Sequence, residues 1–279
     1  MRNGFSSSYK VIISPGRVEK NYWKDLWRYR ELFFFLAWRD ILVRYKQTAI
    51  GIAWSVIRPL LTMVAFTIIF GRLAKLPSEG VPYPIMVFAA MLPWQFFANS
   101  LSEASNSLIE NEKMLTKVYF PRLVVPASSV IVGLLDFLIS FVILALLMFW
   151  YGFMPGWRMF SIPLFLVLAF TASFGFGLWL AALNVKYRDF RYVVPFIVQF
   201  GLYISPVGFT SSIVPDKWRL LYSLNPMVGV IDGFRWAILR GNTPLYWPGF
   251  LLSSAITGVI LISGFRYFRK TEKVLADII

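Results

Sequence analysis

The stretch YWKDLWRYRELFFFLAWRDILVRYKQTAIGIAWSVIRPLLTM, residues 22–63, begins as a charged, aromatic segment and ends as an apolar one. Its second half has the composition of a membrane-spanning helix, although Arg58 and Pro59 lie inside the apolar run. Its first half suits a helix in the lipid headgroup region, where basic and aromatic side chains are both favoured. The stretch therefore predicts an amphipathic helix placed directly before a transmembrane helix.

The rest of the chain is similarly apolar. Hydrophobic residues make up 58% of the 279 positions and charged residues only 15%, whereas an ordinary soluble domain is about a quarter charged. Several runs approach the roughly 20 apolar residues that cross a bilayer as a helix, and none has the alternating pattern of a barrel strand. We therefore predict an all-α polytopic membrane protein with a six-helix transmembrane domain over residues 50–265, with spans near 50–70, 84–105, 123–150, 161–183, 192–209 and 246–265.

Lysine and arginine set the predicted orientation. With six spans, both termini share one side with the loops 107–122 and 184–191, and this side carries 20 of the 28 basic residues, whereas the opposite loops carry seven. By the positive-inside rule, the N-terminal segment 1–48 and the tail 266–279 are expected in the cytoplasm. The only apolar run before the first span, 32–38, is short for a signal peptide, so none is expected. The net charge of +14 is explained by these basic residues beside the spans, where they lie near anionic lipid headgroups. No nucleic-acid partner is therefore expected.

A helical wheel of residues 22–46 separates an aromatic face from a charged face. Asp40 and Arg44 fall out of this register, so a bend or break is expected near 39–46. The apolar face holds Tyr22, Trp23, Leu26, Trp27, Phe33, Phe34, Ala37, Trp38 and Ile41, and the charged face holds Lys24, Asp25, Arg28, Glu31 and Arg39.

Four stretches closely resemble the membrane subunit of ABC exporters that move polysaccharides such as O-antigen and teichoic acid, the ABC-2 type transporter family. They are RDILVRYKQTAIGIAWSVIRPLLTMVAFTIIFGRL (39–73), ENEKMLTKVYFPRLVVP (110–126), LNVKYRDFRYVVPF (183–196) and LNPMVGVIDGFRWAIL (224–239). The resemblance runs from about residue 20 to the carboxyl end. It implies a half-transporter in the inner membrane that pairs with a second copy of itself and with two nucleotide-binding ATPase subunits. Lipid-linked polysaccharide would then pass outward between the two permeases.

The resemblance also implies roles for individual segments. Residues 22–46 are similar to the family's cytoplasmic interface helix, and residues 207–245 are similar to a pair of short re-entrant helices on the exit side. The loop 107–122, a predicted short helix ended by Pro121, corresponds to a coupling helix that docks on the ATPase; a solvated loop that only sets topology is the alternative. The implied ATPase-coupling residues are Trp27, Arg39, Asp40, Glu110, Glu112, Lys113 and Lys117.

ATP hydrolysis is not expected in this chain. The nearest string to a phosphate-binding loop, GFRYFRKT at 264–271, has Arg269 where the second glycine is required. We therefore expect no catalytic residue and no cofactor here, with ATP and Mg in the partner subunit. Because the chain has neither cysteine nor histidine, the usual zinc ligands are absent as well.

Three ionisable residues, Arg58, Glu103 and Asp136, fall within the predicted spans. A charge at the bilayer centre costs about 2.5–3.5 kcal/mol on insertion scales, so each needs a physical reason. One hypothesis pairs Arg58 with Asp136 in a lock that rearranges during transport, provided that helix tilt levels their depths. A static pair, or an arginine that snorkels to the headgroups, is the alternative.

Aromatic residues make up 18% of the chain, and lipid contact with interfacial belts accounts for most of them. A minority is predicted to line a sugar pathway, because the electron-rich faces of aromatic rings attract the C–H faces of pyranoses. The predicted channel residues are Trp54, Trp94, Phe96, Phe200 and Tyr203.

Other functions fit the sequence less well. A membrane glycosyltransferase would require an acidic cluster at the membrane surface, and none is visible. An ion-coupled secondary transporter would require paired ionisable sites and internal repeats, for which Asp136 alone is thin support. Within the ABC exporters, teichoic acid or a small lipophile or drug is the alternative substrate.

Overall fold

The structure is a computed structural model that describes residues 22–46, 51–240 and 244–278. Within these ranges the chain forms helices and no strands, as expected where lipid cannot satisfy backbone polar groups. The elements are α1 (Tyr22–Arg28), α2 (Arg30–Lys46), α3 (Gly51–Phe66), the π-helical η1 (Thr67–Leu73), α4 (Tyr83–Glu110), α5 (Glu112–Leu115), α6 (Val124–Trp150), the 3₁₀ turn η2 (Trp157–Ser161), α7 (Ile162–Lys186), α8 (Phe190–Ile204), the 3₁₀ turn η3 (Ser211–Ile213), α9 (Asp216–Tyr222), α10 (Pro226–Ile238) and α11 (Trp247–Ile278).

Five of the described helices are long and apolar enough to cross a membrane. The fifth predicted span, 192–209, falls on α8, which has 15 residues and is shorter than the others. The predicted tail, 266–279, continues α11 as a helix to Ile278. The five candidate spans are Ala53–Leu73, Tyr83–Glu110, Val124–Trp150, Trp157–Lys186 and Trp247–Glu272.

Helix α4 is the centre of the bundle. Its apolar window has the lowest mean hydropathy of the five candidate spans, 1.3, yet 83% of it is buried, whereas α6 reaches 2.9 with 39% buried. The reason is that α4 packs against α6, α7 and α10, so protein rather than lipid surrounds most of it. Gln95 and Asn99, which dilute this span, line a cavity bordered by α3 and α6.

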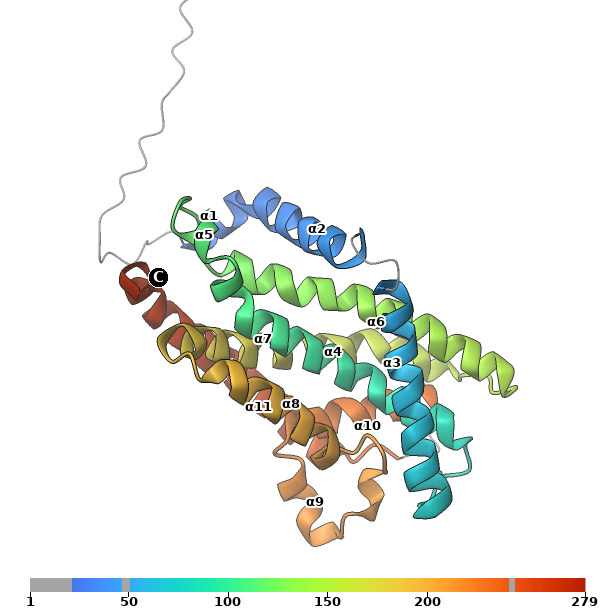
Figure 1. The fold of residues 1–279 in the computed structure, drawn as a ribbon. Coiled ribbons are helices and arrows are strands. Elements are labelled where there is room, and N and C mark those ends of the chain that lie inside the picture. The colour runs from blue at the N-terminus through green and yellow to red at the C-terminus, as the bar shows by residue number, and fades with distance from the viewer. Residues whose placement is uncertain (1–21, 47–50, 241–243, 279) are drawn as a thin grey trace, which may run out of the picture.

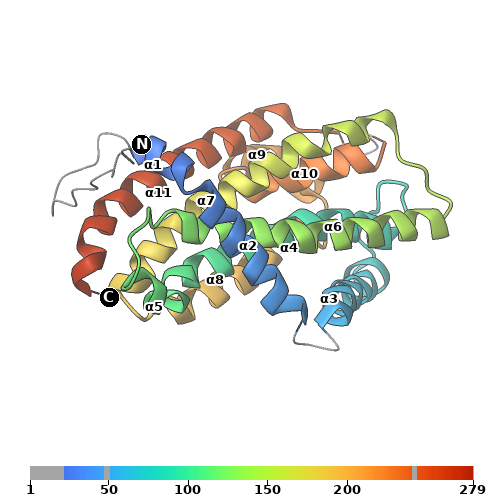
Figure 2. The same cartoon turned by 90° about the horizontal axis from the view of Figure 1, so that it is seen from above.

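One end of the bundle gathers α1, α5 and the C-terminal end of α11 (Figure 1). A shared apolar cluster joins these elements there, and it includes Tyr22, Leu115, Leu123 and Phe268. Helix α2 crosses the bundle diagonally, and α3, seen nearly end-on in Figure 2, runs steeply across the other long helices. The predicted interface helix and the loop 107–122 therefore lie at the same end of the molecule.

The opposite end carries α9 and α10. Helix α10 is almost wholly buried and packs on α4, α7 and α11. The Arg235 side chain, 1% exposed, donates to the carbonyl oxygens of Val207 (2.9 Å), Phe209 (2.6 Å) and Met86 (3.3 Å). A single guanidinium thus fastens α10 to the start of α4 and to the segment after α8.

Helices α7 and α11 approach closely through glycines. A Cβ added at Gly264 would collide with the carbonyl oxygen of Gly175, and one added at Gly175 would lie 2.9 Å from the Cα of Leu261. Small residues allow such close contact between helices in membranes, where dispersion packing rather than the hydrophobic effect drives association.

We expect Gly264→Ala to destabilise the bundle, because α7 and α11 must separate to admit the methyl group, at a cost of about 1–3 kcal/mol. The thermal unfolding midpoint of the detergent-purified chain measures this loss. Gly258→Ala in the same helix is the matched control, since a Cβ there meets nothing within 4 Å. Equal midpoints for the two variants would contradict the proposed packing.

Candidate coupling and translocation site

The N-terminal helices form one wall of the site. Helix α2 runs without interruption from Arg30 to Lys46, so the expected bend near 39–46 is wrong; the break lies at Tyr29, between α1 and α2. Of the two residues that fell out of helical register, Arg44 has acidic partners on α4 and α6, and Asp40 pairs with its neighbour Arg39. These contacts replace the bend as the explanation.

The aromatic face of these helices points away from the bundle. Leu36 and Ala37 are buried, and Leu36 belongs to the apolar cluster that also holds Leu108 and Leu123. Large aromatic side chains on the other side are exposed, namely Trp23, Trp27, Phe34, Phe35 and Trp38. Most of these aromatic side chains therefore face lipid or a partner, although Trp23 also stacks on Phe265 of α11. The other side of the helix pair contacts the bundle through both apolar and polar residues.

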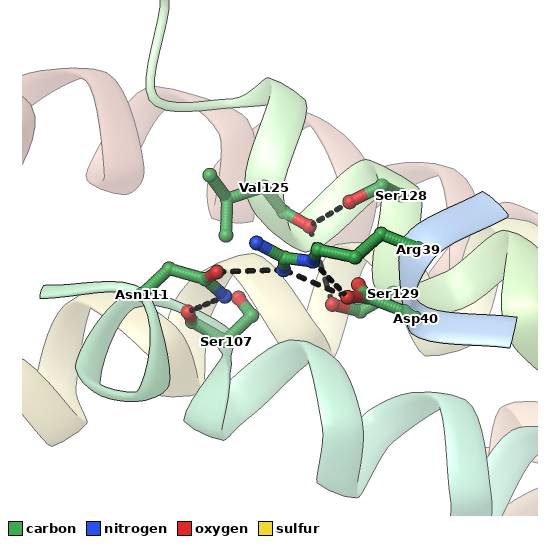
Figure 3. Close-up of polar contacts among 7 residues, drawn as sticks. All are labelled: Arg39, Asp40, Ser107, Asn111, Val125, Ser128 and Ser129. Carbon is green, nitrogen blue, oxygen red and sulfur yellow. Dashed lines mark hydrogen bonds and ion pairs between the residues drawn. The ribbon is translucent and has the colours of Figure 1, made fainter. Parts of the chain in front are cut away.

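The first polar cluster joins α2 to the end of α4 (Figure 3). The Arg39 guanidinium donates to the Asp40 carboxylate at 2.7 Å and to the Asn111 side-chain oxygen at 2.8 Å. Asn111 in turn donates to the carbonyl oxygen of Ser107 at 2.9 Å. Arg39 thereby links the interface helix to the residue that separates α4 from α5.

The second polar cluster lies about one turn further along α2 and reaches the middle of α6. Arg44 forms ion pairs with Asp136 at 3.2 Å and with Glu103 at 3.5 Å. The Tyr45 hydroxyl also donates to Asp136. Burial and the neighbouring Asp136 raise the pKa of Tyr45 to about 12, so this hydroxyl keeps its proton and remains a donor at neutral pH.

Asp136 therefore pairs with Arg44 and not with Arg58, the partner considered from the sequence. The Arg58 guanidinium lies over the Trp54 ring, 5.7 Å from its centroid. Arg44 had been noted only as out of register, because sequence distance gives no indication that the end of α2 reaches Asp136. No signal in the sequence identified Asn111 or the clamp made by Arg235 either.

Two cavities follow the polar side of α2. One, of about 380 Å³, is lined by Arg39, Asp40, Glu103 and Glu110 among others. The other, of about 350 Å³, is lined in part by Trp54, Arg58, Gln95, Asn99, Asp136 and Phe96. Arg44 lines both, so polar walls extend from the end of α4 to the space between α3, α4 and α6.

The remaining predicted coupling residues lie at the surface. Glu112 and Lys113 are exposed on the one-turn helix α5, Lys117 is exposed just after it, and Trp27 is 72% exposed on α1. These side chains are accessible to a partner at the end of the molecule that α1 and α5 share.

The predicted channel residues divide into two groups. Trp94 and Phe96 are buried in the core, whereas Trp54, Phe200 and Tyr203 are exposed. On α8 the exposed aromatics form a stripe at helical spacing, made of Tyr192, Phe196, Phe200 and Tyr203. Among the described residues, no group of three acidic side chains is placed to hold a metal ion.

Long apolar helices around a buried central helix define a multi-pass helical membrane protein. The two polar clusters place its candidate site where α2 contacts α4 and α6. A profile of the family described as ABC-2 type transporter matches residues 31–239. This chain belongs to the ABC-2 type transporter family.

Curated relatives match over most of their length. The chain is 27% identical to an O-antigen export system permease protein RfbA of Myxococcus xanthus, over 86% of this chain and 91% of that protein. It is 28% identical to a protein of the same name from Klebsiella pneumoniae, over 89% and 95% respectively. It is also 25% identical to the polysialic acid transport protein KpsM of Escherichia coli, over 85% and 92%.

We expect charge reversal to identify the partner of Asp136. Asp136→Arg should destabilise the chain by about 1.5–3 kcal/mol, because hydrogen bonds to a charged group are lost. Adding Arg44→Asp should restore part of this stability, with Glu103 opposing full recovery because it would then face a carboxylate. The thermal unfolding midpoint is the measurement. Arg58→Asp combined with Asp136→Arg is the control, and recovery in that double variant would instead support a pair between those two residues.

Proposed function

We propose that this chain is the permease subunit of an ATP-driven exporter that moves lipid-linked polysaccharide from the cytoplasmic to the outer side of the inner membrane. The observation that carries the proposal is the match to polysaccharide permeases along nearly the whole chain, at 85% or more of its residues. The aromatic stripe on α8 and the polar cavities along α2 support it, since they offer the two kinds of surface that a sugar chain contacts.

Six crossings with both termini in the cytoplasm form part of the proposal. Asn184, near the end of α7 and before the fifth crossing, donates to the carbonyl oxygen of Ser105 on α4 at 3.1 Å. Beyond α8, the Gly208 carbonyl oxygen accepts from Tyr83, the first residue of α4, at 2.6 Å. The chain between 184 and 208 thus traverses most of the length of α4, although α8 itself is short.

Helices α9 and α10 serve in this proposal as the re-entrant pair on the exit side. Helix α10 has 13 residues, or roughly 20 Å at 1.5 Å per residue, which is too short to cross a bilayer. Its burial among α4, α7 and α11 fits the rule that irregular segments at membrane depth are tolerated where protein surrounds them.

Coupling would run through α2. ATPase subunits would contact the exposed Trp27, Glu112, Lys113 and Lys117, and their movement would reach the membrane through two links. Arg39 connects α2 to Asn111 at the end of α4, and Arg44 connects α2 to Asp136 in the middle of α6. Because both links are directional polar contacts, displacement of α2 would pull on two transmembrane helices together.

The substrate would pass between two copies of the chain. Helices α3 and α8 lie near each other, since the rings of Phe66 and Tyr203 are 6.3 Å apart. Trp54, Phe200 and Tyr203 would line the pathway, with Phe96 bordering the Trp54 cavity and Trp94 packing behind α8 at Gly201. Weak, repeated stacking contacts suit a polymer that must keep moving.

Purification of the tagged full-length chain from its native membrane tests the proposal. We expect a nucleotide-binding subunit to co-purify, with ATP hydrolysis that lipid-linked polysaccharide stimulates and with none in the isolated chain. Lys113→Glu with Lys117→Glu should reduce recovery of that subunit several-fold. Lys75→Glu with Lys217→Glu, two exposed cations at the other end, is the matched control.

Each alternative predicts a different outcome. Stimulation by teichoic acid precursors or by a small lipophile would reassign the substrate within the same class of exporter. Reproducible recovery without an ATPase would overturn the exporter and favour an ion-coupled transporter, against which the existing ion pair of Asp136 with Arg44 already argues.

We expect Phe200→Ala combined with Tyr203→Ala to slow polysaccharide export several-fold while ATPase recovery stays unchanged. Loss of a stacked aromatic removes about 0.5–1.5 kcal/mol of contact at each site. Export is measured by surface polysaccharide in cells that carry the variant. The control is Phe149→Ala with Phe160→Ala, which removes two exposed rings from other elements, and an equal effect of this pair would contradict an aromatic pathway on α8.

A further inference from the structure

A large apolar groove lies where the N-terminal helices rest on α11. Its volume is about 670 Å³, within the range of about 300–1,000 Å³ typical of ligand pockets. Five elements, α1, α2, α6, α7 and α11, contribute to its walls. The apolar part is formed mainly by Leu123, Val124, Phe170, Phe174, Leu261 and Phe265.

The side chains of Arg30 and Arg266 also border the groove, and the Arg30 guanidinium lies over the neighbouring Trp27 ring, 5.5 Å from its centroid. Arg266 is the first charged residue after the apolar run 247–265, and lies five residues, or roughly 7.5 Å, along α11 from Leu261. The ion pairs of Arg39 with Asp40 and of Arg44 with Glu103 and Asp136, in the described part of the chain, include neither groove arginine. Two cationic residues therefore border a groove whose walls are otherwise almost wholly apolar.

We propose that this groove binds a membrane phospholipid with an anionic headgroup. The lipid phosphate would lie between Arg30 and Arg266, and an acyl chain would extend along Phe174, Phe170 and Leu261. Guanidinium groups favour phosphate because two N–H donors match two phosphate oxygens. The order of charge and apolar surface along the groove is also the order along a phospholipid entering from the headgroup region.

The chain's own N-terminal segment is the competing occupant, since it precedes α1 in the sequence and α1 contributes Trp23 and Leu26 to the groove. Residues 1–21 carry four basic side chains and one acidic one, so their net charge has the same sign as the two groove arginines. Charge complementarity therefore favours an anionic lipid over this segment.

A bound lipid would hold the N-terminal helices in place. One groove wall is the contact of α1 with α11, where the Trp23 and Phe265 rings stack with centroids 5.3 Å apart and planes 12° apart. The Arg269 guanidinium lies 3.7 Å from the centroid of the neighbouring Tyr22 ring. An acyl chain against Phe265 would extend this apolar contact and stabilise the docked position of α1.

Native mass spectrometry of the full-length chain, titrated with phosphatidylglycerol or phosphatidylcholine of the same acyl chains, tests the site. We expect preferential binding of phosphatidylglycerol, weakened about fivefold by Arg30→Gln and again by Arg266→Gln, as expected for each basic residue near an anionic headgroup. Lys24→Gln with Arg28→Gln, two exposed cations of α1 outside the groove lining, should leave binding unchanged. Ala127→Phe, which fills the groove, should weaken both lipids.

Several results would overturn the proposal. Equal binding of the two lipids would exclude recognition of the headgroup charge. If the Lys24 and Arg28 double variant lost as much phosphatidylglycerol binding as the groove variants, general surface charge rather than the groove would explain the binding. Binding that appears only after removal of residues 1–20 would show that the chain's own segment fills the groove. The thermal unfolding midpoint of each variant, measured in parallel, separates loss of the site from loss of the fold.

Discussion

Polar groups at membrane depth must find partners inside the protein, because lipid offers none. Arg44 meets this requirement by lying between Asp136 on α6 and Glu103 on α4. Two anionic side chains on neighbouring spans and a cation on α2 thereby compensate one another. This arrangement determines the position of α2 across the bundle, the two polar cavities and the outward aromatic face. Rotating α2 about its axis would leave Arg44, Glu103 and Asp136 without partners of opposite charge.

The same requirement shapes the other end of the molecule. Arg235 satisfies its guanidinium with three backbone carbonyl oxygens, two of which belong to the irregular segment after α8. The Arg235 guanidinium supplies the hydrogen-bond donors that these carbonyl oxygens would otherwise find in a helix. The chain can therefore leave helical geometry inside the bundle before it forms α10. Arg44 thus fixes the position of α2, and Arg235 fixes the position of α10.

A transporter needs both rigid and movable parts, and the structure separates them. Helices α4, α7, α10 and α11 pack through small residues and buried apolar side chains, which resist deformation because close-packed interfaces tolerate little change in volume. Helices α1 to α3 and α8 expose much more of their surface, and polar contacts or aromatic stacking hold them. Motion driven by a partner at the α1 and α5 end would therefore be confined to the outer elements.

Sequence alone determined the helical membrane class, five of the six predicted spans and the amphipathic character of residues 22–46, because composition and period depend only on neighbouring residues. It also gave a family resemblance that the match over residues 31–239 now confirms. Only the tertiary structure decided which span is central. Helix α4 has the lowest hydropathy of the five candidate spans, because neighbouring helices rather than lipid surround it. The partner of Asp136, the link between Arg39 and Asn111, and the burial of Arg235 were likewise decided in three dimensions, since each joins residues distant in sequence whose relative depth depends on helix tilt.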